Sequence, residues 1–445
     1  MTPASPSGDV TIGIDIGTTS VKAVAADADG NILARARIPH ALRVPSAGKL
    51  EHDVAAAWIR GPRKALAAVR GHGERAVGLS AMVPSLAAVN RRGRPLTPGL
   101  LYGDERGHGS GGGSPATSGE AMQFLRWAAG AAPEAHAYWP AQAVASYALC
   151  GESAVDFSVG GSFAPPFNYV EWDAALLTPI GVSPSQLPRV VNFGEAVGEV
   201  DGLVVSGGTV DFLGEQMVAG GGDEGDVLVG CGTTLLPWAV VAEPREVRGL
   251  WAAPHMGASG MTLLGGASNA GGLFLNWALR LAGTPGRGDE ARPGQVPVWV
   301  PYVRGERTPY HDPSRRASLH DLDLTHGPAA VRRAAYEAAG FVVRHHLELA
   351  EVEAKRLVAT GGGTRVPEWI QALADCTGMP VDVVAVPEGA ALGAAFQARM
   401  ALGLEDRIED AARWARISHR VEPDPAWLEA CAERYARFRE LSGEP

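Results

Sequence analysis

The feature that most constrains the fold of this chain is an internal repeat. Val10–Val24 and Asp226–Val240 each place a Gly-Thr-Thr tripeptide between two apolar runs that have the composition of β-strands. The tripeptides begin at positions 17 and 232, so they are 215 residues apart in a chain of 445. A tripeptide of this kind can recur by chance, but its identical placement between strand-like runs favours a duplicated domain. The six residues are Gly17, Thr18, Thr19, Gly232, Thr233 and Thr234.

Strand-like runs alternate with amphipathic helical segments along the chain, which predicts an α/β fold. The length favours two domains, placed at 1–222 and 223–445. The predicted strands include Val10–Ile14, Val77–Ala81, Leu203–Ser206, Val227–Val229 and Arg356–Ala359. The predicted helices include Val54–Val69, Gly119–Ala129, Asp211–Ala219, Pro328–Glu353, Glu368–Thr377 and Gly389–Leu402.

Composition excludes several classes of protein. The formal charge is −10, with 39 Lys and Arg against 49 Asp and Glu, which disfavours a nucleic-acid partner. No apolar run approaches the roughly 18 residues of a membrane span, and the first nine residues do not resemble a secretion signal. The four cysteines form no CxxC pair, so neither a zinc knuckle nor a disulfide framework is expected. We therefore expect a cytoplasmic protein without a membrane partner.

Two glycine-rich stretches have the composition of connections between elements. Gly107–Ser114 and Gly283–Pro297 combine glycine with proline or polar residues and show no helical or strand periodicity. We expect both to be mobile surface segments with no packed role.

The Gly-Thr-Thr turns have the chemistry of phosphate sites. A tight turn through glycine directs backbone amides and two hydroxyls to one place, and two such hairpins could hold a polyphosphate from both sides. Asp15 lies two residues before Gly17 and could hold Mg²⁺, while Lys22 could add positive charge. The alternatives are that Asp15 bonds turn amides and that Lys22 is a solvated surface residue.

Asp211 is the candidate general base. It follows a buried strand and a glycine turn, at the start of a predicted helix, where a carboxylate could accept a proton from a substrate hydroxyl. The residues alone favour the alternative that Asp211 caps the helix. Asp104 and Arg106 could bind polyol hydroxyls or form the ion pair of an ordinary turn, and the local sequence by itself favours the structural interpretation.

Taken together, these segments resemble the FGGY carbohydrate kinases of the sugar kinase, Hsp70 and actin superfamily. The resemblance extends in order along nearly the whole chain. Its segments are DIGTTSVKA from Asp15, GLSAMVPSL from Gly78, LLYGDERG from Leu100, LCGESAVDFS from Leu149, GGTVDFLGE from Gly207, GDVLVGCGTT from Gly225, GGASNAGGLFLNW from Gly265, PYVRGERTP from Pro301 and the block that starts at Gly361.

The resemblance implies two ribonuclease-H-like domains of an actin-like ATPase fold with an interdomain cleft. Residues 1–222 would bind the sugar and 223–445 would bind ATP, with Mg²⁺ as a second cofactor. Asp211 matches the family's catalytic aspartate, which overturns the capping interpretation, and Asp15 matches the metal-linked acid. The other implied positions fall into two groups. Those for the nucleotide are Gly17, Thr18, Thr19, Lys22, Gly232, Thr233, Thr234, Gly265, Gly266, Gly361, Gly362 and Gly363. Those for the sugar, besides Asp211, are Met82, Val83, Asp104 and Arg106.

The substrate pocket departs from the family pattern. Many members carry polar residues where this chain has Ala81–Ser85, so fewer partners remain for sugar hydroxyls. The form of the GGTVDFLGE segment favours a kinase for a pentulose such as xylulose. The alternatives are a kinase for ribulose, glycerol or a hexulose, and a catalytically weak sugar- or nucleotide-binding regulator. Many members are dimers, so the resemblance suggests a homodimer, although no segment of the sequence demonstrates an interface.

Overall fold

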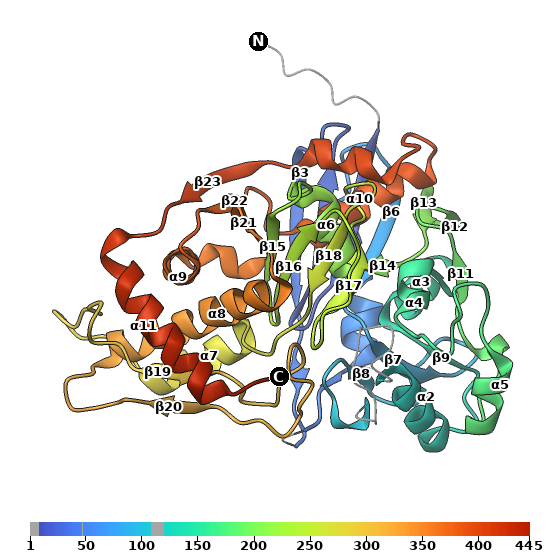
Figure 1. The fold of residues 1–445 in the computed structure, drawn as a ribbon. Helices are drawn as coiled ribbons and strands as arrows, with labels where there is room; N and C mark the ends of the chain where they lie inside the picture. The colour runs from blue at the N-terminus through green and yellow to red at the C-terminus, as the bar shows by residue number, and fades with distance from the viewer. Residues whose placement is uncertain (1–8, 47, 108–119) are drawn as a thin grey trace, which may run out of the picture. The chain divides into compact units, whose positions relative to one another are not determined.

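The computed structural model describes residues 9–46, 48–107 and 120–445, and this part of the chain forms two compact units (Figure 1). The first unit comprises Met1–Val218 and Glu388–Trp414, and the second comprises Ala219–Pro387 and Ala415–Pro445. The expected boundary after residue 222 therefore lies close to the first observed one. The assignment of all of 223–445 to one domain differs from the structure, because helix α10, Gly389–Ala401, packs on strands of the first unit.

A seven-stranded sheet forms the centre of the first unit, in the order β12-β13-β6-β1-β2-β3 with β14 beside β6. β1 is antiparallel to β2 and parallel to β6, which is in turn parallel to β13. Its strands are β1 Val10–Ile16, β2 Ser20–Ala26, β3 Ile32–Pro39, β6 Glu74–Ala81, β12 Ala196–Val200, β13 Leu203–Ser206 and β14 Thr209–Val210. Smaller sheets contain β4 Leu42–Arg43, β5 Glu51–His52, β7 Ser85–Val89, β8 Gly99–Leu101, β9 Ala137–Trp139, β10 Ala154–Asp156 and β11 Arg189–Val191.

Helices cover both faces of this sheet. Side chains alternate between the faces of a strand, so Thr11 and Gly13 face α10, while the neighbouring residues of β1 face the side on which α1 packs. The predicted helix Val54–Val69 forms as a π-helical turn, Ala55–Arg60, that continues into α1. The helices of this unit are α1 Gly61–Ala68, α2 Glu120–Ala131, α3 Ala141–Cys150, α4 Phe157–Gly161, α5 Ala174–Leu177, α6 Asp211–Ala219 and α10.

Two glycines allow α10 to lie directly on the sheet. A Cβ atom at Gly13 would lie 1.7 Å from the carbonyl oxygen of Ala391, and one at Gly78 would lie 2.0 Å from that of Ala394. Thr11 Oγ1 donates to the carbonyl of Ala395 at 2.8 Å beside them. The helix backbone therefore occupies the space that any side chain at these positions would need.

Gly13→Ala is expected to lower the free energy of unfolding of the first unit by about 3 kcal/mol, because backbone atoms cannot rotate away from the added methyl group. Chemical denaturation monitored by circular dichroism measures the effect. Gly130→Ala is the matched control, because a Cβ there meets nothing within 4 Å, and it should leave stability unchanged or slightly raised. Equal unfolding midpoints for the two variants would contradict the packing argument.

The second unit repeats the topology of the first. Its sheet has the order β17-β18-β16-β15-β21-β22-β23, with β15 antiparallel to β16 and parallel to β21. In both units the Gly-Thr-Thr turn joins the two strands at the start of this pattern, which confirms the predicted duplication. The strands are β15 Asp226–Cys231, β16 Leu235–Val241, β17 Trp251–Pro254, β18 Thr262–Gly265, β21 Arg356–Thr360, β22 Val381–Val384 and β23 Ile417–Val421, with β19 Val298–Val300 and β20 Ser318–His320 in a separate pair.

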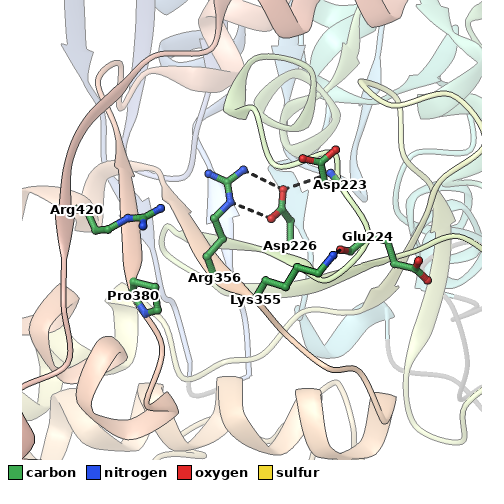
Figure 2. Close-up of a pocket in the computed structure, with 7 residues that line it drawn as sticks. All are labelled: Asp223, Glu224, Asp226, Lys355, Arg356, Pro380 and Arg420. Atoms are coloured by element: carbon green, nitrogen blue, oxygen red, sulfur yellow. Dashed lines mark hydrogen bonds and ion pairs between the residues drawn. The ribbon is translucent and has the colours of Figure 1, made fainter.

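Ion pairs cross four strands of this second sheet. Asp226 on β15 binds the guanidinium of Arg356 on β21 at 2.9 and 3.0 Å. Arg356 also binds Asp382 on β22 at 2.7 Å, and Asp382 binds Arg420 on β23 at 2.6 and 2.9 Å. Figure 2 shows Arg356 and Asp226 in the pocket that they line together with Lys355 and Arg420. These charges neutralise one another, so we assign the pocket a structural role.

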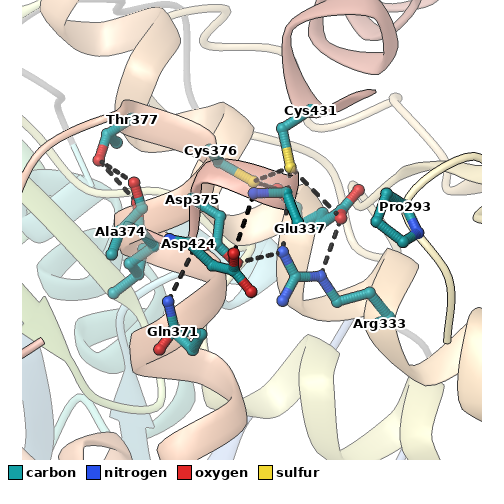
Figure 3. A network of polar contacts seen from close by, with 12 residues as sticks. Pro293, Arg333, Glu337, Gln371, Ala374, Asp375, Cys376, Thr377, Asp424 and Cys431 are labelled. Atoms are coloured by element: carbon teal, nitrogen blue, oxygen red, sulfur yellow. Dashed lines mark hydrogen bonds and ion pairs between the residues drawn. The ribbon is translucent and has the colours of Figure 1, made fainter. Parts of the chain in front are cut away.

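A second polar network lies among the helices of this unit (Figure 3). Glu337 on α8 has a fully buried side chain that accepts from Arg333 at 2.8 Å and from two nitrogens of Arg434 at 2.7 Å. Arg333 also donates to Asp375 on α9 at 2.7 Å. Glu337 therefore connects α8 with α11, and Arg333 connects α8 with α9 through Asp375. The helices of this unit are α7 Gly272–Ala282, α8 Pro328–Ala350, α9 Pro367–Thr377 and α11 Pro425–Ser442.

The structure tests the prediction for only one of the two glycine-rich segments. Nearly all of Gly107–Ser114 lies outside the described residues. Gly283–Pro297 contains no helix or strand, as expected, but it does have a packed role. Asp289 Oδ2 accepts from the amide of Ala329 in the first turn of α8, and the carbonyl of Pro293 accepts from Arg434.

In the part of the chain that the structure describes, no helix combines the length and the apolar character of a membrane span.

Candidate functional site

The residues predicted to carry chemistry form two groups, one in each unit. The first group lies at the β1–β2 hairpin of the first unit, and the second lies at the β15–β16 hairpin of the second unit. Each group is built by the same local topology, because each hairpin connects the first two strands of its sheet.

Asp15 lies near the end of β1, where the sheet register brings two other polar residues beside it. Asp15 is paired with Lys22 across the hairpin and with Ser80 on the parallel strand β6. Ser80 Oγ donates to Asp15 Oδ1 at 3.3 Å, and Lys22 Nζ lies 4.0 Å from Asp15 Oδ2. Burial raises the pKa of Asp15, against the opposing effects of Lys22 and Ser80. The carboxyl is therefore poised to gain from a bound cation.

Asp211 reaches the same end of the sheet through the short strand β14. Thr209 and Val210 pair in parallel with Ser80 and Ala81 of β6, and Asp211 follows as the first residue of α6. Its carboxylate accepts a hydrogen bond from the amide of Phe212 at 2.7 Å. Burial and then the charge of Asp15 raise the pKa of Asp211 to about 7. A carboxylate with a pKa near neutrality has the proton affinity that suits a general base.

Glu215 belongs to this group but was not predicted. It lies four residues after Asp211, so both carboxyls lie on one face of α6. Burial, followed by the charges of Asp211 and Asp15, raises the pKa of Glu215 to about 8, although Lys22 opposes the shift. Close packing fixes the helix, because a Cβ on Gly393 would lie 2.2 Å from the carbonyl of Gly214. The i to i+4 spacing on a predicted helix was the signal that could have revealed Glu215.

Neighbouring side chains hold the first Gly-Thr-Thr turn. Thr18 Oγ1 bonds to the hydroxyl of Tyr102 at 3.0 Å, and the carbonyl of Thr18 bonds to His52 Nε2 at 2.8 Å. Trp58 Nε1 donates to His52 Nδ1 at 3.0 Å, so Nε2 carries the proton and donates to Thr18. Thr19 is exposed at the tip of the turn.

The predicted sugar residues are less available than expected. Met82 is buried, and Val83 is half-buried against the core of the first unit. Asp104 is fully buried, and both of its oxygens accept from Arg106, at 2.6 to 2.9 Å, with the amide of Leu50 as a further donor. This geometry favours the structural alternative that the sequence left open for Asp104 and Arg106.

The second Gly-Thr-Thr turn is fixed by the start of α7. The amides of Gly272 and Leu273 donate to the carbonyls of Gly232 and Thr233 at 2.8 and 3.1 Å. Gly232 is exposed, Thr233 is half-buried and Thr234 is buried. The turn therefore presents glycine backbone and a threonine at the surface of this unit, as a phosphate-binding loop requires.

Arg307 lies against this turn and Glu306 against the loop before α7, and neither was predicted as a site residue. Arg307 donates to Thr234 Oγ1 at 3.1 Å, and Glu306 accepts from Ser268 Oγ at 2.6 Å. Burial raises the pKa of Glu306 to about 7. Both residues lie in the PYVRGERTP segment, but they are more than 70 positions from Thr234, so no local pattern connects them.

The remaining predicted glycines are packed closely. A Cβ at Gly265 would lie 2.0 Å from the carbonyl of Pro237, and one at Gly266 would lie 2.3 Å from Thr308. Gly361 has a φ of +89°, and a Cβ at Gly363 would lie 2.1 Å from the Trp369 ring. Gly362 differs, because its surroundings are open to 4 Å. Close packing or backbone conformation accounts for four of these glycines, whereas the exposed Gly362 leaves room for a flat ligand.

The residues present fit Mg²⁺ and a nucleotide. In the described ranges, no group of three His, Cys, Asp or Glu side chains could enclose a metal ion. Mg²⁺ normally keeps several water molecules and needs only one or two carboxylates with substrate phosphates, so Asp15 is sufficient. The two hairpins supply hydroxyls and glycine backbone for phosphate oxygens.

The two sheets of matching topology define an actin-like ATPase fold, and comparison with known proteins identifies the family. The model of the FGGY family of carbohydrate kinases, N-terminal domain, matches residues 10–110, and that of the C-terminal domain matches residues 227–402. The chain belongs to the FGGY family of carbohydrate kinases. It is therefore a phosphotransferase with an alcohol group as acceptor, and membership of a kinase family implies the use of ATP.

This chain is similar to kinases that are named for different substrates. A xylulose kinase of Streptomyces coelicolor is 28% identical, over 96% of this chain and 95% of its own length. A glycerol kinase of Allorhizobium ampelinum is 31% identical, over 61% of this chain and 60% of its own. The crystal structure of xylulose kinase from Rhodospirillum rubrum has a TM-score of 0.76 at 25% identity, covering 97% of this chain and 98% of that chain. These names do not agree on one substrate.

Proposed function

We propose that this protein phosphorylates a hydroxyl of a pentulose such as xylulose, with Asp211 as the general base and Mg²⁺ held through Asp15. The observation that most supports this proposal is that Asp211 and Asp15 lie together at the ends of β14 and β1, beside Lys22. A protein that only bound sugar or nucleotide would need neither a base near neutral pKa nor a buried acid poised for a cation. This arrangement therefore favours the kinase over the regulator.

The residues divide the work of an in-line phosphoryl transfer. Asp211 accepts the proton of the attacking hydroxyl as that oxygen bonds to the γ-phosphorus of ATP. Lys22 and the Gly-Thr-Thr turns orient the phosphate oxygens, and Asp15 holds the metal ion. When bound, Mg²⁺ supplies positive charge that stabilises the phosphate oxygens and the leaving group. Asp211→Asn should remove the proton acceptor without removing these contacts.

Xylulose is favoured over glycerol because the match to a xylulose kinase spans 96% of this chain, whereas the glycerol kinase match spans 61%. The apolar Met82–Pro84 segment leaves few side-chain partners in that part of the unit. An acceptor that binds here must therefore obtain its remaining hydrogen bonds from the backbone or from other elements.

A substrate panel tests the proposal. ADP release with Mg-ATP is measured with D-xylulose, L-xylulose, D-ribulose, a hexulose, gluconate and glycerol, and the phosphorylated product is identified by mass spectrometry. We expect a pentulose to stimulate turnover well above the rate without sugar. Stimulation by glycerol or gluconate alone would replace the proposed substrate, and nucleotide binding without stimulation by any acceptor would favour the regulator.

The pH dependence of turnover should follow the Asp211 carboxyl. The base must be ionised, so kcat/KM is expected to decrease as the pH falls through about 7, by about tenfold for each pH unit below it. Initial rates from pH 5 to 9 under constant ionic strength measure this limb. Asp156, whose burial raises its pKa to about 6, caps α4 and provides the control. Asp156→Asn should leave this decrease of kcat/KM in place. A wild-type kcat/KM that decreases only below pH 5 would contradict the assignment to Asp211.

A further inference from the structure

The guanidinium of Arg307 meets the second Gly-Thr-Thr turn at its last hydroxyl. Arg307 Nη2 donates to Thr234 Oγ1 at 3.1 Å, so the threonine oxygen serves as an acceptor in this contact. A hydroxyl has a single hydrogen, and the Thr234 hydrogen can then be donated to another acceptor. An anionic oxygen bound by Thr234 would consequently lie beside a guanidinium.

The backbone at Arg307 is held on both sides. Glu306 Oε1 accepts from the amide of Arg307 at 2.7 Å and from the amide of Asn269 at 2.8 Å. Asn269 Nδ2 returns a hydrogen bond to the carbonyl of Gly305 at 2.9 Å. The carbonyl of Arg307 accepts from the amide of His311. These contacts attach the arginine to the loop that precedes α7, which itself binds the Gly-Thr-Thr turn.

The loop before α7 is as tightly constrained as the arginine. Ser268 exchanges two backbone hydrogen bonds with Leu235, at 2.8 and 3.0 Å, directly after the turn. A Cβ at Gly271 would lie 2.4 Å from the carbonyl carbon of Thr234. Turn, loop and arginine therefore form one rigid cluster within the second unit, so the guanidinium is placed before any ligand binds.

We propose that Arg307 is a phosphate-binding residue that, together with Thr234, holds the terminal phosphate of the nucleotide and stabilises the charge of the transferred group. This inference rests on the proposed function in taking Gly232–Thr234 as a nucleotide phosphate loop. A planar guanidinium matches the oxygens of a phosphate and carries a full charge at any physiological pH. The Gly-Thr-Thr turn itself supplies only neutral donors, and Arg307 adds a positive charge beside Thr234.

Binding of nucleotides without sugar tests the proposal directly. Isothermal titration with a non-hydrolysable ATP analogue, ADP and adenosine, each with Mg²⁺, compares wild type, Arg307→Gln, Arg307→Lys and Arg316→Gln. Arg316 is the matched control, because it lies on the same loop, is exposed and donates to the neighbouring carbonyls of Pro313 and Arg315.

Arg307→Gln should lower the affinity for the ATP analogue by about 10- to 100-fold. It should lower the affinity for ADP much less and leave the affinity for adenosine unchanged. Arg307→Lys should fall between wild type and Arg307→Gln, and Arg316→Gln should match the wild type. With an acceptor sugar present, kcat of Arg307→Gln should fall by about 100-fold or more and recover partly with added guanidinium ion. A purely structural role would lower the affinity for all three ligands equally and give no recovery.

The two proposals fail in different ways. If the wild type binds none of the three ligands, the nucleotide loop itself is wrong and the proposed function fails with it. If the wild type binds all three and Arg307→Gln binds them equally well, with unchanged kcat, the role of Arg307 is overturned and the kinase assignment stands. If Arg307→Gln does not fold, the Arg307→Lys comparison of ATP analogue against ADP decides, because a selective loss for the analogue supports the role and an equal loss overturns it.

Discussion

Asp211→Asn is expected to lower the sugar-stimulated kcat by about 10²- to 10⁴-fold. Asparagine keeps the size of the side chain and an oxygen that can accept from the amide of Phe212, which lies 2.7 Å from Asp211 Oδ1 in the wild type. It has no basic oxygen to receive the proton of the acceptor hydroxyl. The loss should therefore appear in kcat, measured by coupled ADP release at saturating sugar and ATP.

The binding of nucleotide separates a lost base from a lost fold. Asp211→Asn should bind ADP as tightly as the wild type, because the nucleotide loops of the second unit are unchanged. Asp201→Asn, at a side chain that is 76% exposed in the first unit, should retain full turnover. A kcat for Asp211→Asn within a few-fold of the wild type would remove Asp211 from the mechanism, whatever its position at the start of α6.

Glu337→Ala should lower the free energy of unfolding by about 3 to 5 kcal/mol, the largest effect expected on stability. The substitution leaves the largely buried guanidiniums of Arg333 and Arg434 without the carboxylate that both contact. Figure 3 shows Glu337 beside Arg333. The substitution also removes one of the polar connections between α8 and α11. Urea unfolding of the second unit can be monitored by fluorescence, because the Arg333 guanidinium lies 3.9 Å from the centre of the Trp427 ring.

An exposed ion pair of the same helix provides the contrast. Glu440 on α11 pairs with Arg437 at 3.0 Å, but its side chain is 67% exposed. Glu440→Ala should therefore change stability by less than about 1 kcal/mol, because water replaces the lost partner. If both variants unfolded at the same urea concentration, the buried network would contribute no more than a surface pair, and the expected effect would be wrong.

Much of the fold was predictable because its signals are local. The strand at Val10 and the helices at Asp211, Pro328 and Gly389 formed close to the predicted positions, since period-2 and period-3.6 patterns report directly on burial. The repeat of Gly-Thr-Thr also predicted two sheets of the same topology. The association of Gly389–Ala401 with the first unit was not predictable, because it depends on glycines at Gly13 and Gly78, nearly 400 and more than 300 residues earlier.

The candidate site, like the fold, was predictable from the sequence only in part. Asp15 and Asp211 were predicted as site residues from strand and helix boundaries together with the family resemblance, and the parallel pairing of β6 with β1 and β14 places both at the same end of the sheet. Asp104 and Arg106 show the limit of this reasoning, because the local sequence favoured an ion pair whereas the family resemblance implied sugar contacts. The structure favours the ion pair, since every oxygen of Asp104 already has a donor.

The sequence by itself determined the alternation of strands and helices, the duplicated Gly-Thr-Thr turns and the acids that follow the strands, because each is a property of a few consecutive residues. Only the tertiary structure decided which distant side chains complete those features. Arg307 reaches Thr234, and Glu215 shares its environment with Asp15 and Lys22. Such contacts depend on how loops and helices pack after the sheets have formed. The spacing from Asp211 places Glu215 on the same helix face, but it does not show which residues of other elements lie there, and no spacing connects Arg307 with Thr234.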